Sequence, residues 1–467
     1  MKPILKTLVI ASFILSAALL SGYQSEDKPV TTKETVYLNA NFIDAEKRDV
    51  RLVHISVRNG KIVSVTTEKP DLRGKSVVDL NQQFVLPGFI DMHVHSWGNN
   101  SVQENYQWLE PRGTLKAALY SGVYGMLDLF SDEDDIFGYR NQQDNSVYEA
   151  KLFAAGPCIT APKGHCSQFG TPTRIITTPE QAKREVADLA TKKPDVIKVV
   201  FDSATFSTAP PPTVDKATLK ALVAEAKKQN IPSIVHVGSW QDVRGAAEVG
   251  ADMVTHTPMT PMPEDIPDLM KKQGTAIVPT LTVQTEWEVA LNTDSYFENS
   301  MLKAVTTPEL IADYHFDLDS KQFARLKAFI KRNEKIQASK HMDSAIKSLH
   351  EAGVPVLVGT DAGNALAFHG YSYHRELHQL VEAGLSEWDV LHSATVGAAS
   401  ELRVDWGIKS GANANFLVLE SSPLVDINNT QTISMLVQHG QIVDRLKLQS
   451  EINPDIWQKL WMYATGW

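Results

Sequence analysis

The sequence predicts a parallel (β/α)8 barrel with β-rich segments at both of its ends. Between residues 87 and 404, short apolar runs alternate with helical stretches about eight times, which is the element order of such a barrel. On either side, residues 36–86 and 405–445 show the period-two alternation of short antiparallel strands.

The flanking segments carry their own turn signals. Residues 53–57 and 62–65 alternate apolar and polar side chains, and Asn59-Gly60 stands between them. This dipeptide is typical of a two-residue β-hairpin turn. The second flank has the same pattern of short strand-like segments, with apolar runs at 416–419 and 435–437.

The central region supplies the strands and helices of the barrel. Apolar runs lie at 88–92, 126–129, 196–200, 233–237, 253–254, 276–278 and 356–359. Apolar residues recur at helical spacing over 179–191, 216–229, 241–249 and 374–383. An open doubly wound sheet is the alternative, but the glycine-rich phosphate-binding signatures and the Gly-x-Ser-x-Gly elbow are absent. The sequence therefore favours the barrel.

Two further segments interrupt this pattern. Residues 285–350 are charged and helix-forming, and an insertion of this length forms either a lid over the barrel or a solvated helical hairpin. The C-terminal tail, residues 446–467, contains Trp457 and Trp461 in an apolar stripe that we expect to pack on the body.

Residues 1–25 have the three-part pattern of an export signal. Lys2 and Lys6 precede a run from 8 to 20 that is apolar except for two serines. The run is shorter than the ~20 residues that span a bilayer, so we expect no stable membrane span after signal removal. The mature protein is expected to be periplasmic or secreted, and an uncleaved tail on a cytoplasmic protein is the alternative. Tyr23 stands where a lipoprotein signal needs a cysteine, which argues against a lipid anchor.

Composition narrows the class of partner. The chain has 467 residues, 43% of them hydrophobic, and a formal net charge of -10 without a basic patch, which argues against a protein that wraps nucleic acid. We expect a small-molecule substrate, and a homo-oligomer stays open. Cys158 and Cys166 are the only cysteines and can form at most one disulfide, so any metal must use other ligands.

Histidines, a lysine and an aspartate gather at predicted strand ends. His93 and His95 flank Val94, and alternation along a strand sends both imidazoles to one side. Lys198 lies inside an apolar strand, where a charged amine is costly unless paired or neutralised. His236, His256 and Asp361 end or follow later strands, at the face where barrel enzymes keep their chemistry.

The remaining histidines are weaker candidates for metal ligands. His374 and His378 share a helix face but lack the glutamate of a metalloprotease helix, so we interpret them as structural. The same interpretation applies to the histidines in helical, loop or flanking-sheet settings: His54, His315, His341, His350, His392 and His439.

The order His-x-His, Lys, His, His, Asp on strands one, four, five, six and eight resembles the amidohydrolase superfamily. Residues 85–95 and 359–363 resemble its entry and exit segments. Within it the chain is most similar to imidazolonepropionase-like and prolidase-like members. The resemblance runs from about residue 36 to residue 443 and implies that both flanks form one small β-sandwich. Asn413-Ala414-Asn415 departs from the usual lysine-alanine-aspartate near the last strand of that sandwich.

This resemblance implies a centre of two divalent metal ions, with zinc favoured. A carbamylated Lys198 would bridge the two ions and a hydroxide would lie between them. Asp361 would accept the proton of that hydroxide and pass it to the leaving nitrogen. His93, His95 and Asp361 would hold one ion and His236 and His256 the other. A single metal beside an unmodified Lys198 is the alternative.

The expected reaction is hydrolysis of an amide C–N bond in a dipeptide, an N-acyl amino acid or a cyclic amide. A lactonase or organophosphate hydrolase is the alternative enzyme, and a non-catalytic binding protein is the alternative of another class. Ser239 occupies a position where deaminases of the superfamily carry a glutamate, which argues against deamination. His165 and His369 are expected to contact the substrate, with surface-loop histidines as the alternative.

Overall fold

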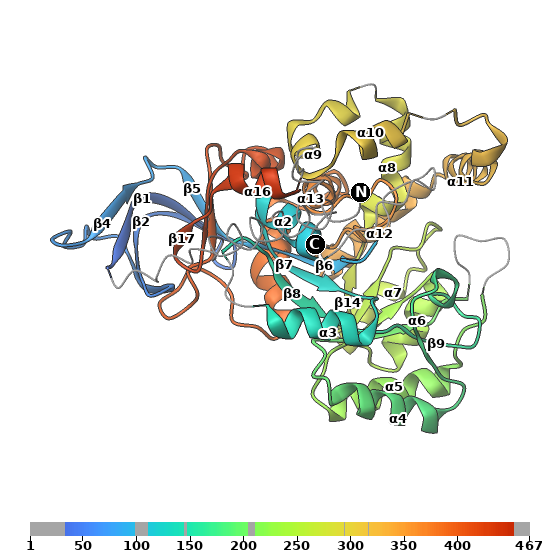
Figure 1. The fold of residues 1–467 in the computed structure, drawn as a ribbon. Coiled ribbons are helices and arrows are strands. Elements are labelled where there is room, and N and C mark those ends of the chain that lie inside the picture. Colours follow the sequence, from blue (N-terminus) through green and yellow to red (C-terminus); the bar gives the residue numbers. More distant parts are fainter. Residues whose placement is uncertain are drawn as a thin grey trace, which may run out of the picture.

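The computed structural model describes residues 33–98, 111–143, 147–203, 211–293, 295–315 and 317–452 (Figure 1). The predicted export signal, including Tyr23, lies outside these residues, and so do residues 453–467 of the predicted tail. Among the described helices, none is both long and apolar enough to cross a membrane.

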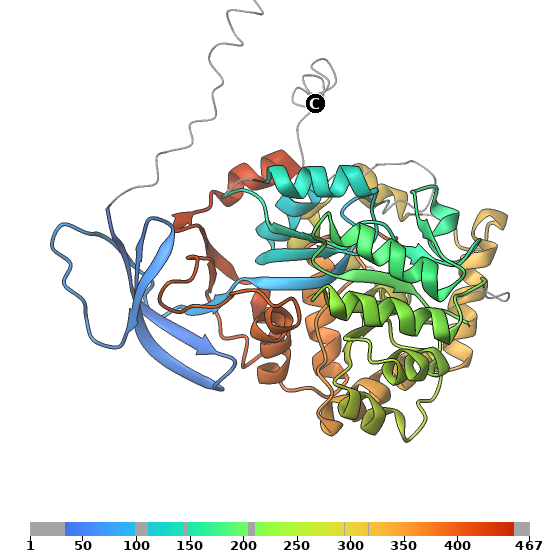
Figure 2. The same ribbon diagram turned by 90° about the horizontal axis from the view of Figure 1, so that it is seen from below.

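One sheet joins strands from both flanks of the chain. The first flank supplies β1 (Thr35–Asp44), β2 (Asp49–Arg58), β3 (Lys61–Thr66), β4 (Ser76–Asp79) and β5 (Phe84–Pro87). The second flank supplies β15 (Phe416–Leu419), β16 (Ile433–Gln438) and β17 (Gln441–Ile442). The strand order is β17-β16-β15-β5-β1-β2-β3, with β4 paired to β1, and antiparallel pairing of β5 with β15 connects the two flanks. Figure 2 shows this sheet at one end of the molecule.

The hairpin predicted at Asn59-Gly60 is confirmed. β2 and β3 pair antiparallel on either side of this dipeptide, and both of its residues have positive φ, 52° and 74°. Two consecutive positive φ angles are what a type I′ turn requires.

Parallel strands fill the centre of the molecule. A three-stranded sheet contains β6 (Phe89–Val94), β7 (Val123–Asp128) and β8 (Lys151–Ala154). A six-stranded sheet has the order β10-β9-β11-β12-β13-β14. Its strands are β9 (Ile159–Thr160), β10 (Arg174–Ile175), β11 (Ile197–Val200), β12 (Ser233–His236), β13 (Met253–Thr255) and β14 (Ala276–Val278).

Residues 355–362 connect these two sheets through backbone hydrogen bonds. The Leu357 amide donates to Ile277 of β14 at 2.8 Å. On the other side, the Met92 amide of β6 donates to Val358 at 2.9 Å, and the Asp361 amide donates to His93 at 2.8 Å. The segment therefore lies between β14 and β6, although it is not itself a regular strand.

Helices alternate with these strands and cover them. Those between β6 and β14 are α2 (Pro111–Tyr120), α3 (Glu133–Gln142), α4 (Pro179–Ala190), α5 (Lys216–Lys228), α6 (Trp240–Glu248) and α7 (Ile266–Gln273). Those after β14 include α8 (Leu281–Asn292), α12 (Ala338–Ala352), α13 (Tyr371–Glu382), α14 (Glu387–His392), α15 (Ala398–Glu401) and α16 (Arg445–Ile452). The helices predicted over 179–191, 216–229, 241–249 and 374–383 correspond to α4, α5, α6 and α13.

Local sequence explains where these helices begin. Thr178 accepts a hydrogen bond from the Gln181 amide, and Pro179 occupies the first turn of α4, where its missing N–H costs nothing. Asp215 and Ser239 cap α5 and α6 in the same way. Ser239, compared above with the glutamate of deaminases, is therefore the N-terminal cap of α6.

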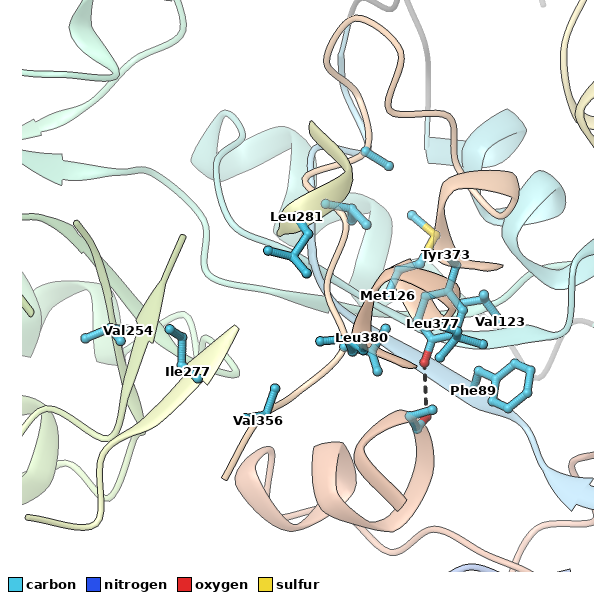
Figure 3. Packing of buried hydrophobic residues seen from close by; sticks show 14 of the residues in the cluster. Phe89, Val123, Met126, Val254, Ile277, Leu281, Val356, Tyr373, Leu377 and Leu380 are labelled. Atoms are coloured by element: carbon cyan, nitrogen blue, oxygen red, sulfur yellow. Dashed lines mark hydrogen bonds between the residues drawn. The ribbon is translucent and has the colours of Figure 1, made fainter. Parts of the chain in front are cut away.

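Apolar side chains from strands and helices form the interior. Phe89 and Val123 of the first strands pack with Tyr373 and Leu377 of α13 (Figure 3). The buried Tyr373 hydroxyl donates to the Ile90 carbonyl at 3.1 Å, so its polar end is satisfied.

The long segment after β14 is helical. It contains α9 (Ser300–Val305), α10 (Pro308–Asp313) and α11 (Ala324–Lys335), followed by α12. Its first helix, α8, is held to α13 by the fully buried Glu286, which accepts hydrogen bonds from Arg375 at 3.2 Å and Gln379 at 2.7 Å. The lid role of this segment stays a prediction.

Candidate metal centre

Parallel register brings the predicted residues to one edge of the strands. His236 ends β12 and is the partner of Val200 in β11 and of Thr255 in β13. His256 follows β13 directly, and Val94 of β6 forms a bridge with Ala362, next to Asp361. Because parallel strands end at the same edge, side chains far apart in the sequence meet there.

Two histidines and an aspartate form the first cluster. The Asp361 Oδ1 atom lies 2.9 Å from His95 Nε2 and 3.3 Å from His93 Nε2. Burial, together with nearby positive charge, holds the pKa of His93 well below its ordinary value. Burial lowers the pKa of His95 too, but the Asp361 carboxylate outweighs burial and the net shift is upward.

Two more histidines form the second cluster. His256 Nε2 lies 2.8 Å from His236 Nδ1, and burial lowers the pKa of both imidazoles. The rings of His93 and His256 are 5.0 Å apart between centroids, so the two clusters adjoin. Neutral imidazoles have a free lone pair, which is the form that binds metal.

Lys198 of β11 is buried beside both clusters, and its side chain is 3% exposed. Burial lowers the pKa of its amine to about 7, although Asp361 and Asp128 oppose the shift. Within the described parts of the chain, no carboxylate oxygen lies within ion-pair distance of the amine. Burial therefore favours the uncharged form of this amine.

Three buried side chains that the sequence did not single out contact the outward nitrogens of the histidines. His236 Nε2 lies 3.3 Å from the Asp202 carboxylate. The hydroxyls of Thr255 and Thr280 lie 2.6 Å from His93 Nδ1 and 2.8 Å from His256 Nδ1. Such contacts fix the ring orientation and the tautomer of a metal-binding histidine. Asp202 follows the end of β11 and could have been found as a strand-end carboxylate, whereas a threonine gives no comparable signal.

The backbone of the site is strained. His256, Thr280 and Asp361 have positive φ angles of 79°, 51° and 58°. Side chains with a Cβ atom rarely adopt this region, least of all a β-branched threonine. Such strain persists where the surrounding structure enforces it, and it is concentrated at functional sites.

The predicted substrate contacts lie in different settings. His165 stacks on His236 with ring centroids 4.5 Å apart and an interplanar angle of 20°, and burial lowers its pKa to about 3. His369 is 4% exposed, and its Nε2 donates to the His95 carbonyl at 3.1 Å. His369 thus supports the backbone beneath a site residue, and contact of either histidine with substrate stays a prediction.

His374 is buried away from the centre. Its Nδ1 lies 2.8 Å from the Thr430 hydroxyl, and its Nε2 donates to the Ser121 carbonyl at 2.9 Å. Both ring nitrogens have partners, which agrees with the structural role expected for this histidine.

The donor atoms present suit divalent cations. The potential ligand atoms of His93, His95 and Asp361 lie within 4.8 Å of one another. Those of His165, Asp202 and His236 also lie within this limit, but there Asp202 contacts His236 Nε2, on the side of the ring away from His256. With Nε2–H of His236 donated to Asp202, its Nδ1 lone pair faces His256. Imidazole and carboxylate ligands in this combination favour zinc and neighbouring transition metals.

Comparison with known proteins agrees with this geometry. The model of the Amidohydrolase family matches residues 84–443. An uncharacterized protein of Mycobacterium tuberculosis is 24% identical over 349 residues, which cover 73% of this chain and 80% of that protein.

Solved structures share the fold. A Xaa-Pro dipeptidase with methionine bound in its active site superposes with a TM-score of 0.71 at 20% identity, covering 88% of this chain and all of that one. The A. niger ochratoxinase gives 0.68 at 21% identity, covering 88% and 95%. The family match spans most of the chain, and we conclude that this protein belongs to the amidohydrolase family.

Proposed function

We propose that the protein is a metal-dependent hydrolase of amide C–N bonds in a dipeptide, an N-acyl amino acid or a cyclic amide. The observation that carries this proposal is the convergence of His93, His95 and Asp361 with His236 and His256 around one buried lysine. The family match supports hydrolysis in general, and the donor set supports metal dependence.

The residues that would hold two divalent cations, with zinc favoured, divide into the two clusters described above. Lys198 would contribute as a carbamate: its neutral amine forms an N–C bond to carbon dioxide and loses a proton, which turns a cation into an anionic ligand. The low pKa of this amine supplies the neutral form that the addition needs. Bound cations would polarise a substrate carbonyl and activate water for attack at neutral pH.

The protein's own side chains have three further tasks. The Asp361 carboxylate would accept the proton of the attacking water and return it to the leaving nitrogen, since an unprotonated amine leaves poorly. Asp202, Thr255 and Thr280 would hold the imidazoles in their binding tautomers. His165, at the rim of the second cluster, would contact the substrate.

The same proposal includes the architecture around the site. Residues 355–362 would act as the eighth strand of a closed (β/α)8 barrel, since they bond to both β14 and β6. The flanking sheet would form a composite domain, and residues 285–350 a lid. The protein would be exported to an oxidising compartment, which agrees with the Cys158–Cys166 disulfide.

Metal analysis combined with a substrate panel tests the function. We expect about two transition-metal ions per chain and hydrolysis of dipeptides or N-acyl amino acids in preference to lactones and phosphotriesters. Activity should be lost in Lys198→Ala and Asp361→Asn but kept in His378→Asn, which changes a partly exposed histidine outside the site. Full activity in metal-free protein would contradict the proposal. Faster hydrolysis of lactones than of amides would contradict the proposed amide substrate and identify a lactonase instead.

A further inference from the structure

A disulfide packs close to the candidate metal centre. Cys158 and Cys166 are bonded across a separation of 8 residues, and both side chains are buried. The bond closes the segment 158–166, which contains β9 and carries His165, the neighbour of Cys166. The residue whose ring stacks on His236 is therefore adjacent to a covalent crosslink.

The disulfide packs against other parts of the site. Phe130 and Val200 form a small buried apolar cluster with the two cysteines. The Phe130 ring lies 6.4 Å from that of His95, and Val200 follows Lys198 by two positions in β11. The crosslink thus fixes the loop against the same strand ends that carry the predicted ligands.

Among the described residues, non-covalent side-chain contacts reach His165 from its own loop and from the site. Its Nδ1 lies 3.2 Å from the side-chain nitrogen Nε2 of Gln168, and the Phe169 ring lies 5.6 Å away at a near-right angle. Cys166 has a φ of 82°, in the region that side chains with a Cβ atom rarely adopt. The disulfide adds a covalent restraint to this conformation.

We propose that the Cys158–Cys166 disulfide is a positioning element of the active site, which holds the His165 imidazole against His236 for contact with the substrate. This inference rests on the proposed function. It assigns to the crosslink a role in turnover in addition to its contribution to stability.

A double-mutant cycle tests the role in turnover. Cys158→Ala/Cys166→Ala should keep its bound metal, because neither cysteine is a predicted ligand. Its kcat/KM should fall about 10- to 100-fold, the effect of misplacing a substrate contact by ~1 Å. His165→Ala should cost a similar factor in the wild type and less than about 3-fold when added to the cysteine variant, since the contact is then already lost. Unchanged kcat/KM in the folded, metal-loaded cysteine variant would overturn the proposal, and so would fully additive effects.

A second measurement needs no substrate. Diethyl pyrocarbonate modifies accessible neutral imidazoles, and mass spectrometry of the peptide that contains His165 gives its rate of modification. The rate should rise severalfold in the cysteine variant, whereas that of the exposed His392 should not change. Equal His165 rates in both proteins would overturn the positioning role. This readout decides the inference even if the wild type hydrolyses no amide, an outcome that would refute the proposed function instead.

A second double substitution of the cysteines controls for effects of lost packing on folding. Cys158→Val/Cys166→Ala restores apolar volume beside Phe130 and Val200 but not the crosslink. The two pairs should give the same changes in kcat/KM and in His165 modification. Wild-type values in the Val/Ala pair would show that packing, and not the bond, positions His165.

Discussion

Asp202→Asn tests whether the buried carboxylate orients a metal ligand. In the wild type, His236 Nε2 donates to Asp202 at 3.3 Å, which leaves the Nδ1 lone pair facing His256. Asparagine has nearly the same volume but only a neutral oxygen, and its NH2 group can instead favour the opposite tautomer. The variant therefore changes the tautomer preference with little change in packing.

The expected loss follows from the geometry. Removing a carboxylate that orients a metal-binding histidine costs about 10- to 100-fold in metal affinity. Because 3.3 Å is longer than the ~2.9 Å of a strong N–H···O bond, we expect the lower end of that range. A 10-fold loss corresponds to about 1.4 kcal/mol.

Metal titration of the metal-free protein measures this effect. One of the two sites should weaken about 10-fold in Asp202→Asn while the other keeps its affinity, since only His236 is affected. Asp134→Asn, a change at a largely exposed carboxylate of α3, is the matched control and should bind as the wild type does. Wild-type affinity at both sites of Asp202→Asn would refute the orienting role.

Three further predictions concern catalysis and stability. Asp361→Asn should lower kcat by about 10²- to 10⁴-fold, because the amide cannot take up the proton, and steady-state kinetics on folded protein checks this. Arg375→Ala should lower the free energy of unfolding by about 3–5 kcal/mol, because the buried Glu286 loses its only ion-pair partner among the described residues and keeps only neutral ones such as Gln379. Lys347→Ala, at an exposed ion pair, should cost less than about 1 kcal/mol, and equal losses in denaturant unfolding would contradict this. Burial and Glu382 raise the pKa of Asp343 to about 6, so the folded state binds the proton more tightly and stability falls as pH rises from about 4 to 6. Asp343→Asn should therefore raise the Tm of the metal-free protein more at pH 7 than at pH 4, and an equal change at both pH values would contradict the assignment.

Local signals predicted the regular elements well. Period-two alternation around Asn59-Gly60 identified a hairpin, because this turn needs only local backbone chemistry. Helices α4 and α5 were predicted within one residue, because apolar residues at helical spacing are a local signal. The caps Thr178 and Asp215, which the structure shows, act over the same short range. The predicted strand at 356–359 has no regular ladder, because its pairing depends on backbone bonds to two distant strands.

The sequence predicted those site residues whose side-chain type is unusual at their place in a strand. A lysine inside an apolar strand and histidines at strand ends stand out, and the structure brings Lys198, His236 and His256 together. Thr255 and Thr280 do not stand out, because a threonine at a strand end is ordinary until a histidine is seen beside it. The position of His369 beneath His95 likewise depends on a contact between residues 274 positions apart.

A crystal structure of the metal-loaded protein with anomalous diffraction tests the central claim most directly. The account predicts two anomalous peaks, one at His93, His95 and Asp361 and the other at His236 and His256, with carbamate density that extends from Lys198 to both. A bare Lys198 amine, with no metal at His236 and His256, would contradict it.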